Sequence, residues 1–162
     1  MKNTKIIVKT KSKSYPIYFG DGIINTTGKL IQKNLPNVKK ICLISDKNIP
    51  LVKLEQLKKS LKKYNPKVYS LTVKEKTKSF KVAYKLIESL LKDNFNRSDC
   101  IIALGGGVLG DLSAFISSLT KRGIKFVNIP TTLLAQADAS IGGKTGVNSN
   151  QGKNLIGTFY QP

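Results

Sequence analysis

Two periods of apolar and polar residues alternate along this chain. Short apolar runs that end in polar residues or glycine are typical of strands, and they occur at residues 5–9, 15–19, 40–46, 68–73, from 100 to the glycines at 105, and 125–129. Between them, apolar residues recur every three or four positions, as on one face of a helix, after Asp21-Gly22 through Leu30 and Ile31, at 51–64, at 80–91, and from Gly110 to Leu119. This alternation predicts an α/β fold whose mainly parallel sheet carries helices on both faces.

The predicted topology also indicates where a ligand binds. In open parallel sheets, ligands lie beyond the carboxyl ends of the strands, where the residues that follow each strand converge. These residues are Asp46 and Asn48, then Glu75 to Lys78, then Gly105 to Asp111, then Thr131 and Thr132.

A glycine-rich loop follows the strand that begins at Cys100. Gly105, Gly107 and Gly110 fit the G-x-G-x-x-G pattern, in which backbone N–H groups approach a pyrophosphate at a helix N-terminus. The acidic residue that normally follows about twenty positions later is missing, and Pro130 stands in that region. We expect Asp111 in the first turn of the helix, where its carboxylate either caps free N–H groups or accepts hydrogen bonds from a bound cofactor.

A second glycine-rich region lies near the end of the sequence. Gly142-Gly143-Lys144-Thr145-Gly146 places a lysine among residues that permit close backbone approach, and Gly152-Lys153-Asn154 repeats the arrangement. The residues alone leave two interpretations open. Lys144 and Lys153 are either two more surface lysines or ligands of an anion, and Asp138 either caps a local turn or takes part in a reaction.

The formal charge of +19 raises the question of a polyanionic partner. Only Arg97 and Arg122 are arginines, whereas proteins that read nucleic-acid sequence depend on arginine for bidentate contacts with bases. The lysines are scattered, and the densest group, Lys58, Lys59, Lys62 and Lys63, shares a helix with apolar Leu54, Leu57 and Leu61. We therefore expect a solvated basic surface that attracts small anionic substrates, without specific nucleic-acid binding.

The cysteines and the absence of histidine limit the redox and metal chemistry that the sequence can support. Cys42 and Cys100 lie in apolar runs without a C-x-x-C spacing, so we expect small buried side chains. The sequence has no histidine, and no metal site is predicted within it. No signal-like amino terminus and no stretch of about eighteen apolar residues occurs, so we expect a cytoplasmic protein without a membrane partner.

The order of these motifs resembles the 3-dehydroquinate synthase family. It runs from the Gly105 loop through Arg122-Gly123, Pro130-Thr131-Thr132 and Gly142-Gly143-Lys144-Thr145 to Gly152-Lys153-Asn154. The resemblance implies a Rossmann-like NAD-binding domain over residues 1–162, with the substrate-binding region beginning at 138–162. It implies NAD contacts from Asp46, Asn48, Glu75, Lys78, Gly107, Val108, Leu109, Gly110, Asp111, Thr131, Thr132, Lys144 and Lys153. Val73-Lys74 departs from the Asp-Gly expected in many relatives, which affects the reach of Glu75.

The resemblance also implies a reaction. The family converts 3-deoxy-D-arabino-heptulosonate 7-phosphate into 3-dehydroquinate and phosphate in the shikimate pathway, and its members are homodimers. Its catalytic positions correspond to Asp138, Lys144, Lys153 and Asn154, and to Arg122, which reaches the phosphate of the neighbouring subunit. A divalent metal, zinc or cobalt, is held by a glutamate and two histidines of a following helical domain, which is absent from these 162 residues.

Because the metal-binding domain of the family is absent from these 162 residues, three interpretations of the sequence are open. In the first, the sequence is the nucleotide-binding part of a complete synthase. In the second, it is a noncatalytic NAD-binding module. In the third, it belongs to another sugar-phosphate cyclase or to a glycerol dehydrogenase-like enzyme. In each case we expect the isolated 162-residue chain to have no synthase activity, because it offers no histidine ligand for a catalytic metal.

Overall fold

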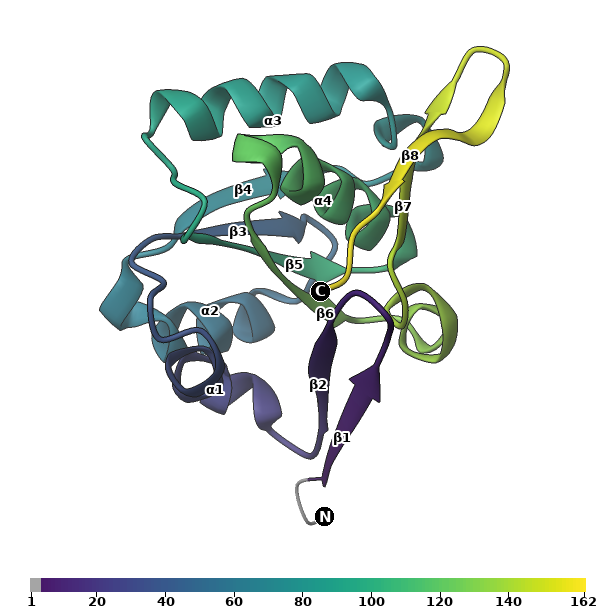
Figure 1. Cartoon of the computed structure of the whole chain (residues 1–162). Helices are drawn as coiled ribbons and strands as arrows, with labels where there is room; N and C mark the ends of the chain where they lie inside the picture. The colour runs from purple at the N-terminus through teal and green to yellow at the C-terminus, as the bar shows by residue number, and fades with distance from the viewer. Residues whose placement is uncertain (1–3) are drawn as a thin grey trace.

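The computed structural model describes residues 4–162, which form a parallel sheet between two helical layers (Figure 1). The sheet has the strand order β4-β3-β5-β6. Its strands are β3 (Ile41–Asp46), β4 (Lys67–Leu71), β5 (Cys100–Gly105) and β6 (Lys125–Pro130). All three neighbouring pairs are parallel, which confirms the predicted sheet.

Two helices cover each face of the sheet. Helices α1 (Thr27–Asn34) and α2 (Leu51–Ser60) pack on one face, with Ile31 and Leu57 against Leu43, Ile102 and Leu104. Helices α3 (Phe80–Lys92) and α4 (Gly107–Leu119) pack on the other face, in a core that includes the side chains of Ile44, Leu90, Ile101, Leu112 and Phe115. The central strands β3 and β5 are therefore buried on both faces, which explains their uninterrupted apolar sequences.

Two antiparallel hairpins complete the described residues. The first joins β1 (Thr4–Lys9) to β2 (Ser14–Phe19), and both strands occur where the sequence predicts strands. The second joins β7 (Lys144–Ser149) to β8 (Gly152–Phe159), packs against α4, and extends away from the sheet (Figure 1). The glycines of this second hairpin stand out in the sequence, but its strands were not predicted.

Short one-turn segments join these elements. They are the 3₁₀ turns Ile23–Thr26, Lys62–Tyr64, Glu75–Thr77 and Thr120–Arg122, and a π-helical turn, Ala135–Ala139. Two predicted boundaries were too long. Helix α2 ends at Ser60, before the 3₁₀ turn that reaches Tyr64, and β4 ends at Leu71, because Thr72 and Val73 lead into the turn at Glu75.

The burial expected for the two cysteines and for the apolar face of the lysine-rich helix is confirmed. Cys42 and Cys100 are buried free thiols, and burial raises the pKa of Cys42 to about 12. Leu57 and Leu61 point into the core, whereas Lys59, Lys62 and Lys63 are exposed. Among residues 4–162, no helix has the length and apolarity needed to cross a bilayer.

Candidate functional site at the carboxyl edge of the sheet

The register of the sheet aligns the ends of its four strands. Asp46 lies opposite Leu71, Ser45 lies opposite Leu104, and Gly105 lies opposite Pro130. Neighbouring strands are about 4.8 Å apart, so the segments that follow these residues meet at one edge. The connections from β3 and from β5 leave in opposite directions along the sheet, which makes the β3/β5 boundary the topological switch point where such folds bind ligands.

The glycine loop connects β5 to α4 at this boundary. Gly106 is the N-cap of α4 and provides no side-chain cap, so the first amides of the helix, from Gly107 to Leu109, face outward without one. The loop lies close to the segment after β6. A Cβ on Gly106 would lie 3.3 Å from Cγ2 of Thr132, and a Cβ on Gly107 would lie 3.3 Å from Cβ of Ala139. Bare backbone at the start of a 13-residue helix is a favourable arrangement for an anion.

Asp111 occupies a different place from the one predicted. Helix α4 begins at Gly107, so Asp111 is its fifth residue, and its first turn contains no acidic side chain. The carboxylate of Asp111 does not cap the helix. It accepts a hydrogen bond from the ammonium group of Lys78, in an ion pair that joins α4 to the turn after β4.

Burial dominates the electrostatics of Asp111. Desolvation raises the pKa of its carboxyl group, and this effect exceeds the lowering effect of the hydrogen bond from Lys78. The negative charges of Glu75 and Asp138 raise the pKa further, which places both carboxylates in the electrostatic surroundings of Asp111. Lys144 and Asp111 line one small hollow between α4, β6 and β7. The structure thus groups five of the predicted residues around one helix start.

Asn148 connects the second hairpin to this group. Its side-chain amide donates to Oε1 of Glu75 at 2.8 Å, and its backbone N–H donates to the carbonyl of Lys78 at 2.8 Å. Its Oδ1 accepts from the backbone N–H of Asn154 at 2.9 Å. Asn154 therefore belongs to the site's surroundings through Asn148, and the hairpin is held against the turn after β4.

The remaining cofactor candidates flank the glycine loop. Thr131 donates its backbone N–H to the carbonyl of Gly105 at 3.0 Å, and the hydroxyl oxygen of Thr132 accepts from the backbone N–H of Ala135 at 3.2 Å. Both threonine side chains are exposed. On the other side of the switch point, Oδ1 of Asp46 accepts from the backbone N–H of Asn48 at 3.0 Å, which fixes the turn after β3.

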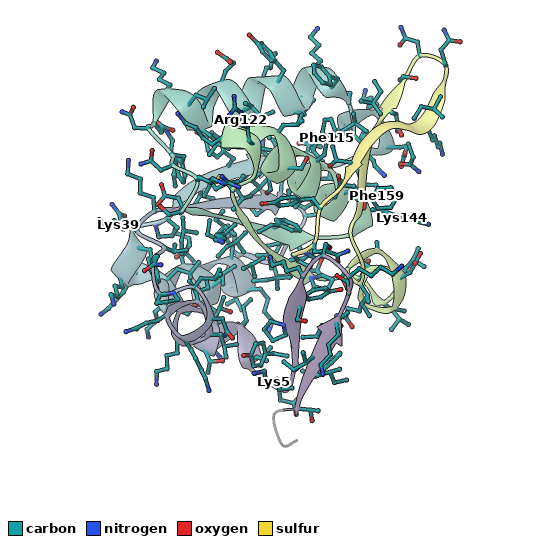
Figure 2. All side chains as sticks on the ribbon, viewed as in Figure 1. Lys5, Lys39, Phe115, Arg122, Lys144 and Phe159 are labelled. Carbon is teal, nitrogen blue, oxygen red and sulfur yellow. The ribbon has the colours of Figure 1, made fainter. Side chains whose placement is uncertain are left out.

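Two predicted residues are not brought into this group. Lys153 is exposed on β8. Arg122 follows the C-terminal end of α4, and the 13 residues of that helix span about 20 Å. Figure 2 shows Arg122 and Lys144 well separated in the view. Arg122 lies beyond the last turn of α4, and its φ of 62° places it in the left-handed region.

Sequence reasoning missed two asparagines. Asn148 follows the glycine-rich motif at 142–146 by two residues, and an asparagine before a Ser-Asn turn is a visible hairpin signal. Asn128 lies in the apolar strand β6, where an amide side chain stands out. Its side-chain oxygen is buried without a hydrogen-bond partner in the described part of the chain, beside Gly110 and in the hollow that Asp111 and Lys144 line.

These residues do not form a metal centre by themselves. Within residues 4–162, no three His, Cys, Asp or Glu side chains are grouped to hold a metal ion. The site as described offers backbone amides, carboxylates, hydroxyls and ammonium groups, which suit a phosphorylated and hydroxylated ligand.

Known sequences similar to this chain include several 3-dehydroquinate synthases. The chain is 48% identical over 158 residues to the 3-dehydroquinate synthase of Pelagibacter ubique (strain HTCC1062), a match that covers 98% of this chain and 43% of that relative. It is 45% identical over 160 residues to the 3-dehydroquinate synthase of Rhizobium meliloti (strain 1021), covering 98% of this chain and 42% of the relative. The chain thus spans less than half the length of these relatives.

Solved structures show the same fold. A 2-deoxy-scyllo-inosose synthase complexed with carbaglucose-6-phosphate, NAD+ and Co2+ superposes with a TM-score of 0.87 at 25% identity, over 98% of this chain and 44% of that one. The 2-epi-5-epi-valiolone synthase of Streptomyces hygroscopicus subsp. jinggangensis 5008, with NAD+ and Zn2+ bound, gives 0.68 at 28% identity, over 78% of this chain and 36% of that one. The 3-dehydroquinate synthase N-terminal family matches residues 68–162, more than half of the sequence, and the chain belongs to this family.

Proposed function

We propose that this chain binds NAD and forms the nucleotide-binding part of a 3-dehydroquinate synthase. One observation carries the proposal. The uncapped start of α4, the carboxylate of Asp46 and the ion pair of Lys78 with Asp111 all lie at the switch point between β3 and β5. Membership of the family and the NAD+ present in two related solved structures support the choice of dinucleotide.

Each part of the dinucleotide has a matching set of residues. The amides of Gly107, Val108 and Leu109 suit the pyrophosphate, because they lie at the positive end of α4. A carboxylate of Asp46 or Glu75 can accept both hydroxyls of a ribose. Thr131 and Thr132, which follow β6 beside the glycine loop, offer a donor and an acceptor to the nicotinamide amide.

The substrate contacts follow from the lysines around the hairpin. We assign Lys144, Lys153 and Asn154 to the phosphate of the sugar phosphate and Asp138 to the reacting carbon. The bound NAD supplies reversible removal of a hydride, and the residues of this chain hold the substrate against it. Arg122 lies about one helix length from this group, which supports its assignment to the phosphate site of a partner subunit in a homodimer.

The identity of the substrate rests on the degree of resemblance. Identity to the 3-dehydroquinate synthases reaches 48%, whereas identity to the structurally similar 2-deoxy-scyllo-inosose synthase is 25%. A heptulosonate phosphate is therefore favoured over the substrates of the other cyclases. No step through a metal is assigned to this chain, because its described residues offer no ligand group.

Calorimetric titration of the 162-residue chain with NAD tests the cofactor proposal. We expect saturable binding to the unmodified chain and at least tenfold weaker binding to Asp46→Asn. Glu88→Gln is the matched control, because Glu88 is exposed on α3, and this variant should bind NAD like the unmodified chain. Absence of NAD binding to a chain that unfolds cooperatively would refute the proposal.

A further inference from the structure

The segment 131–143 joins β6 to β7 and carries Asp138, one of the two residues that bracket the proposed substrate site. Of its residues, only Ala135 and Gly143 are buried. Its regular structure centres on the π-helical turn Ala135–Ala139, a kind of turn that is rare and occurs frequently at functional sites. A segment this exposed has little core packing of its own, so a few contacts with other elements must fix its position.

Two contacts hold the first part of this segment. The backbone N–H of Thr131 donates to the carbonyl of Gly105 at 3.0 Å. Ala139 then lies against the glycine loop, since a Cβ on Gly107 would lie 3.3 Å from the Cβ of Ala139. The π-helical turn that carries Asp138 therefore lies beside the start of α4.

Tyr15 holds the last part of the segment. Its phenol oxygen accepts a hydrogen bond from the backbone N–H of Gly142 at 3.0 Å. Within residues 4–162, this is the one hydrogen bond that joins any of residues 132–142 to an element distant in the sequence. Gly142 has a φ of 106°, so the chain turns sharply at this residue. The bond from Gly142 to Tyr15 therefore acts where the chain sets its direction before β7.

The burial of Tyr15 makes it a rigid partner for Gly142. Only 4% of Tyr15 is exposed, and it is the one buried residue of β1 and β2. A buried aromatic ring has little conformational freedom, and its hydroxyl normally finds a hydrogen-bond partner. Figure 1 shows the first hairpin beside the segment between β6 and β7. The hairpin thus contributes its one buried side chain to the segment that carries Asp138.

Gly143 is held from the opposite side. Its carbonyl accepts from the backbone N–H of Tyr160 at 2.7 Å, which continues the pairing of β7 with β8. Lys144 follows directly, as the first residue of β7. The two glycines between Asp138 and Lys144 are therefore fixed by β2 on one side and by the end of β8 on the other.

We propose that Tyr15 is a positioning residue, whose phenol oxygen fixes Gly142 and thereby sets the placement of Asp138 relative to Lys144. The inference rests on the proposed function, because that function assigns Asp138 and Lys144 to the substrate. Tyr15 acts through the backbone of Gly142, and it is not assigned a contact with the substrate. Asp46 and the glycine loop are held by the parallel sheet instead, so loss of the Tyr15 hydroxyl affects the substrate residues and leaves the NAD residues in place.

Amide hydrogen exchange of Tyr15→Phe tests this placement in the 162-residue chain. The variant keeps the buried ring and removes the acceptor of the Gly142 N–H. We expect exchange to be about tenfold faster at Gly142, because its hydrogen bond is lost. We expect faster exchange also at Ser140 and Ile141, whose N–H groups donate to carbonyls of the π-helical turn. Faster exchange at Gly142 alone would mean that Tyr15 only attaches the first hairpin, and it would overturn the proposal, as would unchanged exchange at all three amides.

Tyr18→Phe is the matched control. Tyr18 lies on the same strand, and its hydroxyl donates to Oδ1 of Asn34 on α1 at 3.1 Å. The control therefore also removes one phenol hydrogen bond from β2, but away from the segment that carries Asp138. It should leave exchange at residues 140–142 unchanged. Equal acceleration in the two variants would indicate a general loosening of the hairpin and would count against a specific role of Tyr15.

Binding of inorganic phosphate in the presence of saturating NAD gives a functional readout. We expect Tyr15→Phe to weaken phosphate binding about tenfold, because the Lys144 segment is displaced, and to leave NAD affinity unchanged. Equal losses of NAD and phosphate affinity would mark a general structural role and overturn the proposal.

Lys144→Met separates the failure of this inference from the failure of the proposed function. Weaker phosphate binding in Lys144→Met, without any loss in Tyr15→Phe, overturns the role of Tyr15 and leaves the proposed function intact. Unchanged phosphate binding in Lys144→Met refutes the assignment of Lys144 to the phosphate. In that case the exchange of the Ser140 and Ile141 amides alone decides whether Tyr15 positions the turn of Asp138.

Discussion

The ammonium group of Lys78 and the carboxylate of Asp111 form an ion pair that links the turn after β4 to the second turn of α4. Only 6% of the Lys78 side chain and 24% of the Asp111 side chain are exposed. Two cofactor candidates that lie 33 residues apart in the sequence therefore support each other's position. Replacing either residue therefore leaves its partner as a charged side chain that is poorly solvated and has lost its counter-ion.

We predict that Lys78→Met and Asp111→Asn each lower the free energy of unfolding by about 1–3 kcal/mol, because each leaves a buried charged group without its partner. The double variant should be less destabilised than the sum of the two single variants. Urea unfolding of the four proteins measures this coupling. Additive losses would contradict a direct interaction between the two side chains.

The titration of Asp111 gives a second readout of the same pair. Burial raises the pKa of its carboxyl group in the folded chain, so the folded state holds this proton more tightly than the unfolded state. The contribution of Asp111 to stability is therefore full at acidic pH and declines as the pH rises through its folded pKa. NMR titration should place the midpoint above the ordinary value of about 3.9, and Lys78→Met should raise it further, because the hydrogen bond that lowers it is lost.

The fold was predictable because its signals are local. Ile41–Ile44 and Ile101–Leu104 are short, continuous apolar runs that end in polar residues or glycine, as is typical of a strand buried on both faces, and Phe80–Lys92 has the period of a helix. The convergence of Asp46, the glycine loop and the Thr131 segment followed from the rule for carboxyl ends of parallel strands. The register of the sheet then confirmed it residue by residue.

The rest of the site depends on contacts between segments far apart in the sequence. The glycines indicate that Asp111 lies near the start of a helix, although it is the fifth residue of α4 and not part of its first turn. Its pairing with Lys78 depends on the path of the chain after β4. The hairpin of β7 and β8 was missed because its glycines and asparagines conceal the alternation that marks a strand. Its attachment through Asn148 involves a turn more than 70 residues earlier, for which no local pattern exists.

Asn148 should therefore control how firmly the second hairpin is held. We predict that Asn148→Ala weakens NAD binding by about tenfold, since the loss of the bonds to Glu75 and Asn154 frees two candidate ligand segments at a cost of about 1.4 kcal/mol. The matched control is Asn150→Ala, which removes an exposed asparagine from the turn of the same hairpin. Calorimetric titration of both variants with NAD measures the two affinities. Equal losses of NAD affinity in the two variants would argue against a role specific to Asn148.

Gly28 tests the packing of the helical layer on the opposite face. A Cβ at this position would lie 2.0 Å from the backbone carbonyl oxygen of Ser60, at the end of α2. We predict that Gly28→Ala destabilises the chain by about 1–3 kcal/mol, because α1 and α2 must separate to admit the methyl group. Lys29→Ala, at the exposed neighbouring position, should change the unfolding midpoint little. A Gly28→Ala protein as stable as the unmodified chain would mean that the two helices adjust freely.

The final prediction concerns the choice between the two nicotinamide dinucleotides. Asp46 and Glu75 place carboxylates at the edge where a ribose is proposed to bind, and a carboxylate accepts bonds from free ribose hydroxyls but repels a 2′-phosphate. Lys78 is the cation that could reverse this preference, yet its ammonium group is engaged by Asp111. We therefore expect NAD to bind at least tenfold more tightly than NADP.

Asp46→Asn should reduce this preference for NAD over NADP chiefly by weakening the binding of NAD. Asp111→Asn should reduce it by freeing the ammonium group of Lys78 to bind the extra phosphate of NADP. Parallel titrations of the three proteins with both dinucleotides measure these ratios, and tighter binding of NADP to the unmodified chain would rule out the assignment of the carboxylates to the ribose.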